Sequence, residues 1–199
     1  ASLLNSASSR GIAANLRKLS KLADETLKAL WLAANMPADF ALLAVGGFGR
    51  AQLFPHSDID VLLLLPEHAK PESDALLTQK IESFISNCWD SGLEIGSSVR
   101  SVADCVAQAS ADVTVQTSLL ESRLVCGNKK LYATFLNAFR ANLDPKAFFV
   151  AKTLEMRQRH QKFENTPYAL EPNCKESPGG LRDLHIILWV ANAANLGKT

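Results

Sequence analysis

The segment ALLAVGGFGRAQLFPHSDIDVLLLLP, residues 41–66, decides the fold of this chain. It holds two short apolar runs, 41–45 and 59–65, of which the first stops at Gly46-Gly47 and the second at a proline. Short apolar runs that end at turn residues are typical of buried strands. The segment therefore predicts a strand, a glycine-rich turn and a second strand.

The remaining periodicity is mostly helical. Apolar residues recur at helical spacing over 12–30 and 76–89, whereas 93–102 predicts a third strand. Beyond it we expect only helices, together with a loop at 166–180 that is rich in Pro, Asn and Gly. The expected helices span 113–124, 129–142, 146–162 and 181–196. The pattern predicts an α+β fold, with a small mixed β-sheet flanked by helices and a helical second half.

Composition excludes several classes of protein. The chain of 199 residues has 21 Lys and Arg against 20 Asp and Glu, a net charge of +1, and is 47% hydrophobic. Such a balance does not call for nucleic acid or an anionic membrane as a partner, and the apolar runs are too short to span a bilayer. Cys88, Cys105, Cys126 and Cys174 are far apart and form no CxxC pair, so we expect free thiols in a cytoplasmic protein.

Asp58 and Asp60 are the strongest candidates for catalytic residues. They are two positions apart at the start of the second apolar run. Alternate residues of a strand point to one face, so the two carboxylates should project together. Neighbouring carboxylates repel each other unless a cation lies between them, and their oxygens suit Mg²⁺ or Mn²⁺. The pair therefore predicts a divalent metal site.

Gly46 and Gly47, which end the first strand, are candidates for phosphate binding. A residue without Cβ lets backbone amides approach an anion closely. Phosphate beside paired carboxylates is the arrangement of metal-assisted phosphoryl or nucleotidyl transfer. The sequence GGFG lacks the spacing of a dinucleotide-binding GxGxxG fingerprint, and no Walker A lysine follows it.

At these residues the chain resembles the DNA polymerase β-like nucleotidyltransferase superfamily, in which Gly-Gly or Gly-Ser is followed by Asp-x-Asp. More narrowly, it resembles the amino-terminal domain of the bacterial bifunctional PII uridylyltransferase/uridylyl-removing enzymes. LEIGSSVR at 93–100 and LEPNCKESPGGLRDLH at 170–185 carry this narrower resemblance, which covers about residues 30–196. Ser97 is a departure, because the family commonly has His there.

The resemblance implies a domain organisation. It indicates an amino-terminal helix in 1–36, the nucleotidyltransferase core in 37–125 and a helical region in 126–199. We expect the chain to be a fragment of a longer, multifunctional enzyme. The family's HD hydrolase domain and ACT domains should lie outside it, and the chain has no His-Asp dipeptide.

The resemblance also implies an activity. The core is expected to transfer UMP from UTP to a tyrosine of the PII protein, in the regulation of nitrogen metabolism, with release of pyrophosphate and with Mg²⁺ or Mn²⁺ as cofactor. The superfamily usually has a third metal-binding carboxylate on the third strand, for which Glu94 is the candidate and Glu121 the alternative.

Four further residues are candidates for nucleotide binding, each with a structural alternative. Arg50 either meets the triphosphate or caps the edge of the sheet, and Ser57 either bonds a phosphate or metal-bound water or caps the turn. Lys175 and Arg182 either present cations to phosphate or belong to a structural clasp in which Arg182 pairs with a carboxylate. Base preference stays open at Gly-Gly and Asp-x-Asp, so an adenylyltransferase and a non-catalytic nucleotide-binding regulatory module are the alternative functions.

Overall fold

The computed structural model describes residues 9–168, 170–171 and 173–196. Its centre is a four-stranded sheet in the order β3-β2-β1-β4. β1 (Ala41–Ala44) runs antiparallel to both β2 (Ile59–Leu65) and β4 (Arg123–Gly127), whereas β2 and β3 (Ile95–Ser101) are parallel. The predicted mixed sheet and its place in an α+β fold are thus confirmed.

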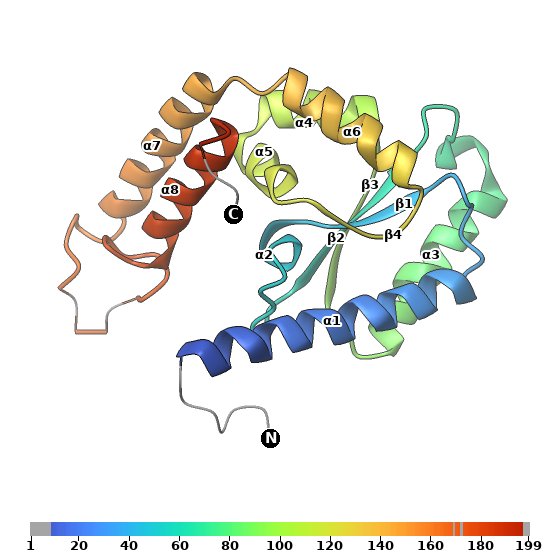
Figure 1. Cartoon of the computed structure of the whole chain (residues 1–199), viewed down its shortest axis with the longest axis horizontal. Coiled ribbons are helices and arrows are strands. Elements are labelled where there is room, and N and C mark those ends of the chain that lie inside the picture. The colour runs from blue at the N-terminus through green and yellow to red at the C-terminus, as the bar shows by residue number, and fades with distance from the viewer. Residues whose placement is uncertain (1–8, 169, 172, 197–199) are drawn as a thin grey trace.

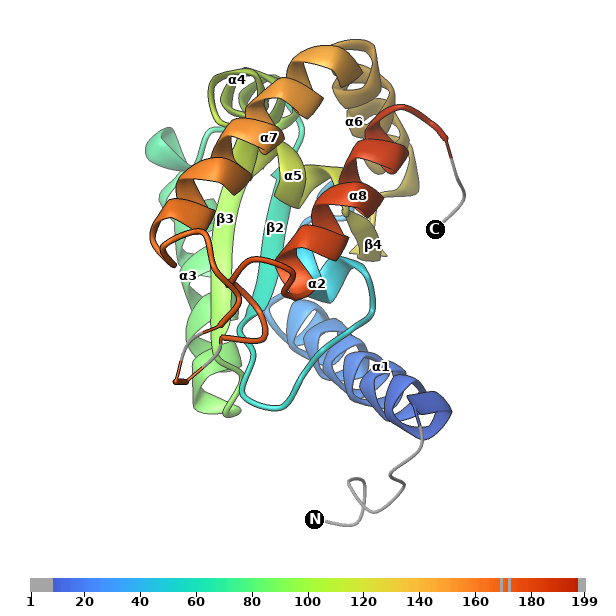
Figure 2. The same ribbon diagram turned by 90° about the vertical axis from the view of Figure 1, so that its left-hand side faces the viewer.

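Helices cover both faces of the sheet (Figure 1). The long α1 and α3 pack on one face, and α4, α5 and α6 lie over the other. α7 and α8 lie side by side and extend the second layer beyond the sheet, next to α5 (Figure 2). The helices are α1 (Ser9–Ala33), α2 (Gly46–Gly49), the 3₁₀ turn η2 (Pro71–Ser73), α3 (Ala75–Asp90), α4 (Val102–Ala111), α5 (Val113–Leu120), α6 (Lys129–Ala141), α7 (Pro145–Gln161) and α8 (Leu181–Ala193).

β2 is buried on both faces, and its alternation fixes where the acidic pair points. Leu63 and Leu65 pack into the core under α1 and α3, whereas Leu62 and Leu64 pack into the core beneath the second layer of helices. Side chains alternate along a strand, so Asp60 belongs to the face of Leu62 and Leu64. The carboxylate is thereby directed to the side on which α5 and α8 lie.

β4 was not predicted from the sequence, and here the expectation was wrong. We expected one helix over 113–124, but α5 ends at Leu120 and the chain then forms β4. The segment has only five residues and no clear alternation, and its strand conformation is stabilised by pairing with the distant β1. β4 also crosses the expected boundary between residues 125 and 126, so the sheet extends into the segment assigned to the helical region.

Two contacts from α1 fix the chain around the Gly-rich segment. Arg123 of β4 donates two hydrogen bonds to Asp24, of 2.7 and 3.0 Å, and its guanidinium lies 5.3 Å from the ring centroid of Phe48 in α2. Ser20 Oγ accepts a hydrogen bond of 3.0 Å from the amide of Leu53. The amino-terminal helix therefore contacts the loop that leads to β2 at Leu53 and, through Arg123, supports Phe48 of α2. None of the helices in the described part of the chain is long and apolar enough to cross a bilayer.

Candidate active site

A cleft of about 840 Å³ lies between the sheet and the helical half. Its lining combines segments far apart in sequence: the α2 turn, the start of β2, α5, α7 and the loop that leads into α8. The charged and histidine side chains that line it are Arg50, His56, Asp58, Asp60, Glu121, Lys152, Glu155, Lys175, Glu176, Arg182 and His185. The predicted site residues Gly46, Gly47 and Ser57 line it as well. The cleft thus brings together every predicted site residue except Glu94.

Asp60 is held at the start of β2. Its backbone carbonyl accepts a hydrogen bond of 3.0 Å from the amide of Val45. Its carboxylate lies between two glycines: a Cβ added to Gly96 would be 2.7 Å from Oδ1, and one added to Gly46 would be 3.3 Å from Oδ2. Desolvation and the nearby Asp58 carboxylate raise the pKa of Asp60 above its ordinary value of 3.8.

The two aspartates have no compensating cation among the residues that the structure describes. In the described part of the chain, neither the Asp58 nor the Asp60 carboxylate takes part in an ion pair or a side-chain hydrogen bond, although both line a cleft that contains four Lys and Arg side chains. Three of these cations are paired with other carboxylates. Two close carboxylates without a partner favour the binding of a cation.

The Gly-rich segment forms the short helix α2 rather than an open turn. Gly46 has φ +56°, a conformation that favours glycine. Gly49 admits the backbone of Glu121, because a Cβ there would lie 2.0 Å from the Glu121 carbonyl oxygen. A Cβ on Gly47 would meet only the end of the Arg50 side chain, at 3.7 Å. Backbone conformation therefore favours glycine at 46 and packing requires it at 49, whereas position 47 is open to the cleft.

Glu121 lies at the junction of the two halves of the molecule. It follows α5, its side chain is 6% exposed, and its two oxygens accept hydrogen bonds from Arg50 and from Trp189 Nε1. Burial raises the pKa of Glu121, although Arg50 and Trp189 oppose that rise. Arg50, predicted to meet phosphate or cap the sheet, is thus oriented within the cleft by Glu121.

The helical half supplies most of the positively charged side chains that line the cleft. Lys152 of α7 is almost completely buried, with Nζ 2.7 Å from Glu155 and 4.7 Å from the ring centroid of Trp189. Arg182 of α8 lies over the same ring at 5.5 Å and donates a hydrogen bond of 3.1 Å to Glu176. The pairing with a carboxylate is the one expected for a structural clasp, yet Arg182 also lines the cleft.

His185 is a cleft residue that the sequence did not single out. Its ring lies 5.5 Å from that of Trp189, and its Nδ1 is buried without a hydrogen-bond partner. Burial, together with Arg50, Arg182 and Lys175, lowers the pKa of His185 to about 4, so the imidazole is neutral at pH 7. The available signal was its spacing on α8, because residues 182, 185 and 189 share one helical face.

Glu94 lies immediately before β3, and its carbonyl accepts a hydrogen bond of 3.0 Å from the amide of Ile59. β2 and β3 are neighbours, with Asp60 paired to Gly96, but Glu94 is exposed and does not line the cleft. In the described residues no group of three or more His, Cys, Asp or Glu side chains is arranged to hold a metal ion. The third carboxylate therefore stays a prediction.

The family-model and sequence comparisons with known proteins both find uridylyltransferases. A family model described as GlnD PII-uridylyltransferase matches residues 147–199, which include α8 and nearly all of α7. The chain is 59% identical over 182 residues to a protein of Cupriavidus pinatubonensis, 58% over 182 to one of Cupriavidus metallidurans and 56% over 184 to one of Burkholderia mallei. Each of the three is named a bifunctional uridylyltransferase/uridylyl-removing enzyme.

These alignments cover 92% of this chain but only 20 to 21% of the relatives. The chain thus spans about a fifth of the length of the curated proteins it matches. Among solved structures, a chain described as "Crystal structure of the toxin-antitoxin with AMP-PNP" aligns with 71% of this chain and 95% of its own length, at 12% identity and a TM-score of 0.34. A likeness that low carries no conclusion here.

Proposed function

Because this chain belongs, over the segment that it spans, to the family of bifunctional uridylyltransferase/uridylyl-removing enzymes, we propose that its cleft transfers UMP from UTP to a tyrosine of the PII nitrogen-signalling protein and releases pyrophosphate. The observation that carries the proposal is that Asp58 and Asp60 have no cationic partner among the described residues. The other carboxylates of the cleft are each paired with a Lys or Arg side chain. The family name supports uridylyl over adenylyl transfer.

The residues fit a hard divalent cation such as Mg²⁺ or Mn²⁺. Asp58 and Asp60 offer carboxylate oxygens, the ligands these ions prefer, and no protein cation competes for them in the described part of the chain. Oxygens of the nucleotide and water would complete the coordination, because Mg²⁺ is commonly bound by one or two carboxylates plus phosphate. When bound, the metal neutralises phosphate charge and acidifies the attacking hydroxyl.

The task of the protein's own residues is to hold the triphosphate in one orientation and to exclude other orientations. In our proposal Gly46 and Gly47 leave room for a phosphate beside the carboxylates, and Ser57 donates a hydrogen bond to a phosphate oxygen or to metal-bound water. Lys175 and Arg182 hold the departing pyrophosphate, since cations placed where negative charge develops stabilise the transition state. Arg50 is kept available to the same group by Glu121, which fixes its direction.

The acceptor hydroxyl has to approach the α-phosphorus opposite the departing pyrophosphate. His185 lines this cleft as a neutral imidazole and is a candidate for contact with the substrate. We place the reaction in the cytoplasm, a reducing compartment in which Cys88, Cys105 and the other free thiols are stable.

The test is an assay of transfer by the 199-residue chain. The chain is incubated with PII, Mg²⁺ and either UTP or ATP, and pyrophosphate release is followed together with the mass of PII. We expect pyrophosphate and uridylylated PII with UTP, and neither product with the Asp60→Asn variant. Transfer from ATP in place of UTP would favour an adenylyltransferase, and nucleotide binding without pyrophosphate would favour a regulatory module; either result contradicts the proposal.

A further inference from the structure

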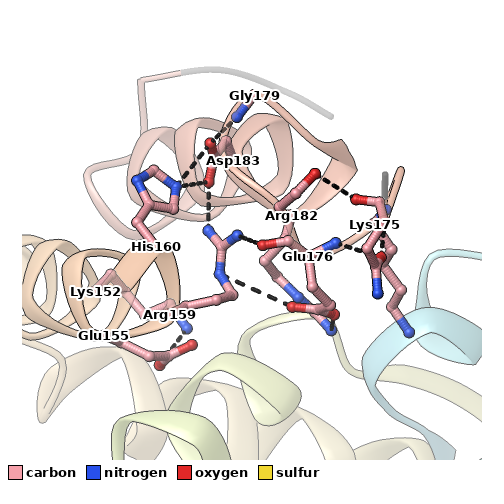
Figure 3. Close-up of polar contacts among 11 residues, drawn as sticks. Lys152, Glu155, Arg159, His160, Lys175, Glu176, Gly179, Arg182 and Asp183 are labelled. Atoms are coloured by element: carbon pink, nitrogen blue, oxygen red, sulfur yellow. Dashed lines mark hydrogen bonds and ion pairs between the residues drawn. The ribbon is translucent and has the colours of Figure 1, made fainter. Parts of the chain in front are cut away.

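A network of polar contacts joins α7 to the start of α8 (Figure 3). Its centre is Asp183, in the first turn of α8. The Asp183 carboxylate accepts hydrogen bonds from Arg159 Nη2 and from the amide of Gly179, the latter of 2.8 Å, and His160 Nε2 lies 3.0 Å from both of its oxygens. These bonds outweigh burial and lower the pKa of Asp183, so this carboxylate is ionised at neutral pH.

The contacts continue from Asp183 toward the cleft. Arg159, whose side chain is 11% exposed, also donates a hydrogen bond to the backbone carbonyl of Glu176, and its Nε lies 3.8 Å from Glu176 Oε2. The other oxygen of Glu176 accepts the 3.1 Å hydrogen bond from Arg182. One continuous chain of ion pairs therefore runs from Asp183 through Arg159 and Glu176 to Arg182 (Figure 3).

Backbone hydrogen bonds join the loop between the two helices to the start of α8. The amides of Leu181 and Arg182 donate hydrogen bonds of 2.9 Å to the carbonyls of Cys174 and Lys175. Gly180 is packed against this turn, because a Cβ there would lie 2.8 Å from the carbonyl oxygen of Ser177. Lys175 is consequently bonded to the backbone of α8, and the Arg159–Asp183 ion pair joins that helix to α7.

We propose that Arg159 and Asp183 are positioning residues: they fix Glu176 and through it Arg182, and they fix the start of α8 to which Lys175 is bonded, in the geometry that receives the triphosphate. This inference rests on the proposed function, since it assigns these two cations to the nucleotide. Long cationic side chains lose rotamer freedom when a ligand fixes them, so a network that orders them beforehand strengthens binding. The part of the loop that carries Lys175 is thus preorganised by contacts with α7, and these contacts lie outside the cleft.

Electrostatics and positioning predict opposite effects of one substitution on the affinity for UTP. Asp183→Asn removes a negative charge from the neighbourhood of Lys175 and Arg182, so electrostatics alone would strengthen the binding of an anion. Loss of positioning would weaken it, because an amide cannot hold Arg159, His160 and the Gly179 amide at once. Whether Asp183→Asn binds UTP more tightly or more weakly therefore separates the two effects.

The experiment is calorimetric titration of the 199-residue chain, in Mg²⁺, with UTP and with uridine. We expect Asp183→Asn to bind UTP about tenfold more weakly than the wild-type protein, an amount typical of a lost charge-assisted hydrogen bond, and to bind uridine unchanged. Circular dichroism and thermal unfolding establish that the variant is folded.

A matched pair of arginines on α7 supplies the control. Arg159→Gln should weaken UTP binding as Asp183→Asn does, whereas Arg157→Gln, two residues earlier and exposed, should not. Arg159→Lys keeps the charge without the forked geometry and serves if the glutamine variant does not fold. Arg182→Gln added to Asp183→Asn should cost little more, since both changes act through Arg182.

Three results are to be distinguished. If the wild-type protein binds UTP and the folded Asp183→Asn variant binds it as tightly or more tightly, the positioning role is wrong while the proposed function stands. Equal losses for UTP and uridine would also overturn it, because the effect would not depend on phosphate. If the wild-type protein binds no UTP, the proposed function fails, and the positioning role fails with it.

Discussion

The indole Nε1 of Trp189 donates a hydrogen bond of 2.6 Å to Glu121 Oε1. This bond joins α8 to the residue that follows α5, and the other oxygen of Glu121 receives Arg50 from the Gly-rich segment. The ring of Trp189 in turn supports Lys152 and Arg182. One carboxylate and one indole thus join the helical half to the Gly-rich segment across the cleft.

Glu121 should be replaceable by Gln but not by Ala. Burial raises its pKa, so the ionised form is disfavoured in the folded protein, and a neutral amide that still accepts from Trp189 should cost less than about 1 kcal/mol. Glu121→Ala leaves the Trp189 and Arg50 donors unsatisfied and should cost about 2–4 kcal/mol. Urea unfolding measures both, and equal losses for the two variants would contradict this account of the junction.

Gly96→Ala should displace the Asp60 carboxylate without unfolding the protein. The added Cβ would lie 2.7 Å from Asp60 Oδ1, the end of a side chain that can rotate away. We expect a Tm close to that of the wild-type protein in EDTA, but loss of most of the stabilisation that Mg²⁺ gives. Ser98→Ala, on the same face of β3, is the control; full Mg²⁺ stabilisation of Gly96→Ala would show that Asp60 does not need its present position.

His185 should make the stability depend on pH. Its pKa is about 4 in the folded protein against 6.5 in the unfolded chain, so the unfolded state binds more protons between these values. Stability conferred by the neutral ring is therefore present above pH 6.5 and is lost as the pH falls toward 4. Urea unfolding across this range should show a smaller decline for His185→Gln. An identical decline in both proteins would be inconsistent with a buried neutral imidazole.

The sequence predicted the part of the site that is local. Asp58 and Asp60 flank Ile59 at the start of an unmistakable apolar run, so strand alternation alone placed both carboxylates on one face. β1 and β2 were predictable for the same reason. Gly96 is different, because its contact with Asp60 depends on the parallel register of two strands that are distant along the chain.

What the sequence could not supply is the set of contacts made by tertiary packing. Glu121 was expected inside a helix, as an alternative metal ligand, and instead follows α5 and pairs with Arg50 and Trp189. Both partners are tens of residues away, so no local pattern indicates them. His185 shares a helical face with Arg182 and Trp189, but only the docking of α8 shows that this face lines the cleft.

Asp58→Asn and Asp60→Asn should leave the fold intact. Neither side chain forms a hydrogen bond or ion pair with another side chain in the part of the chain that the structure describes, and the ionised form of Asp60 is disfavoured, as its raised pKa indicates. Removing either charge relieves repulsion, so we expect equal or slightly higher Tm in EDTA. A loss of several degrees for both variants would mean that the carboxylates have a structural role.

The most direct test of the metal-and-nucleotide site is calorimetric titration of UTP with and without Mg²⁺, in the wild-type protein and in Asp60→Asn. If Asp58 and Asp60 hold the ion that bridges to the triphosphate, removing Mg²⁺ with EDTA should weaken UTP binding to the wild-type protein at least about tenfold, or 1.4 kcal/mol. Asp60→Asn should bind UTP weakly and equally in both conditions. The account is contradicted if the wild-type protein binds UTP equally well in Mg²⁺ and in EDTA, or if folded Asp60→Asn retains the full dependence on Mg²⁺.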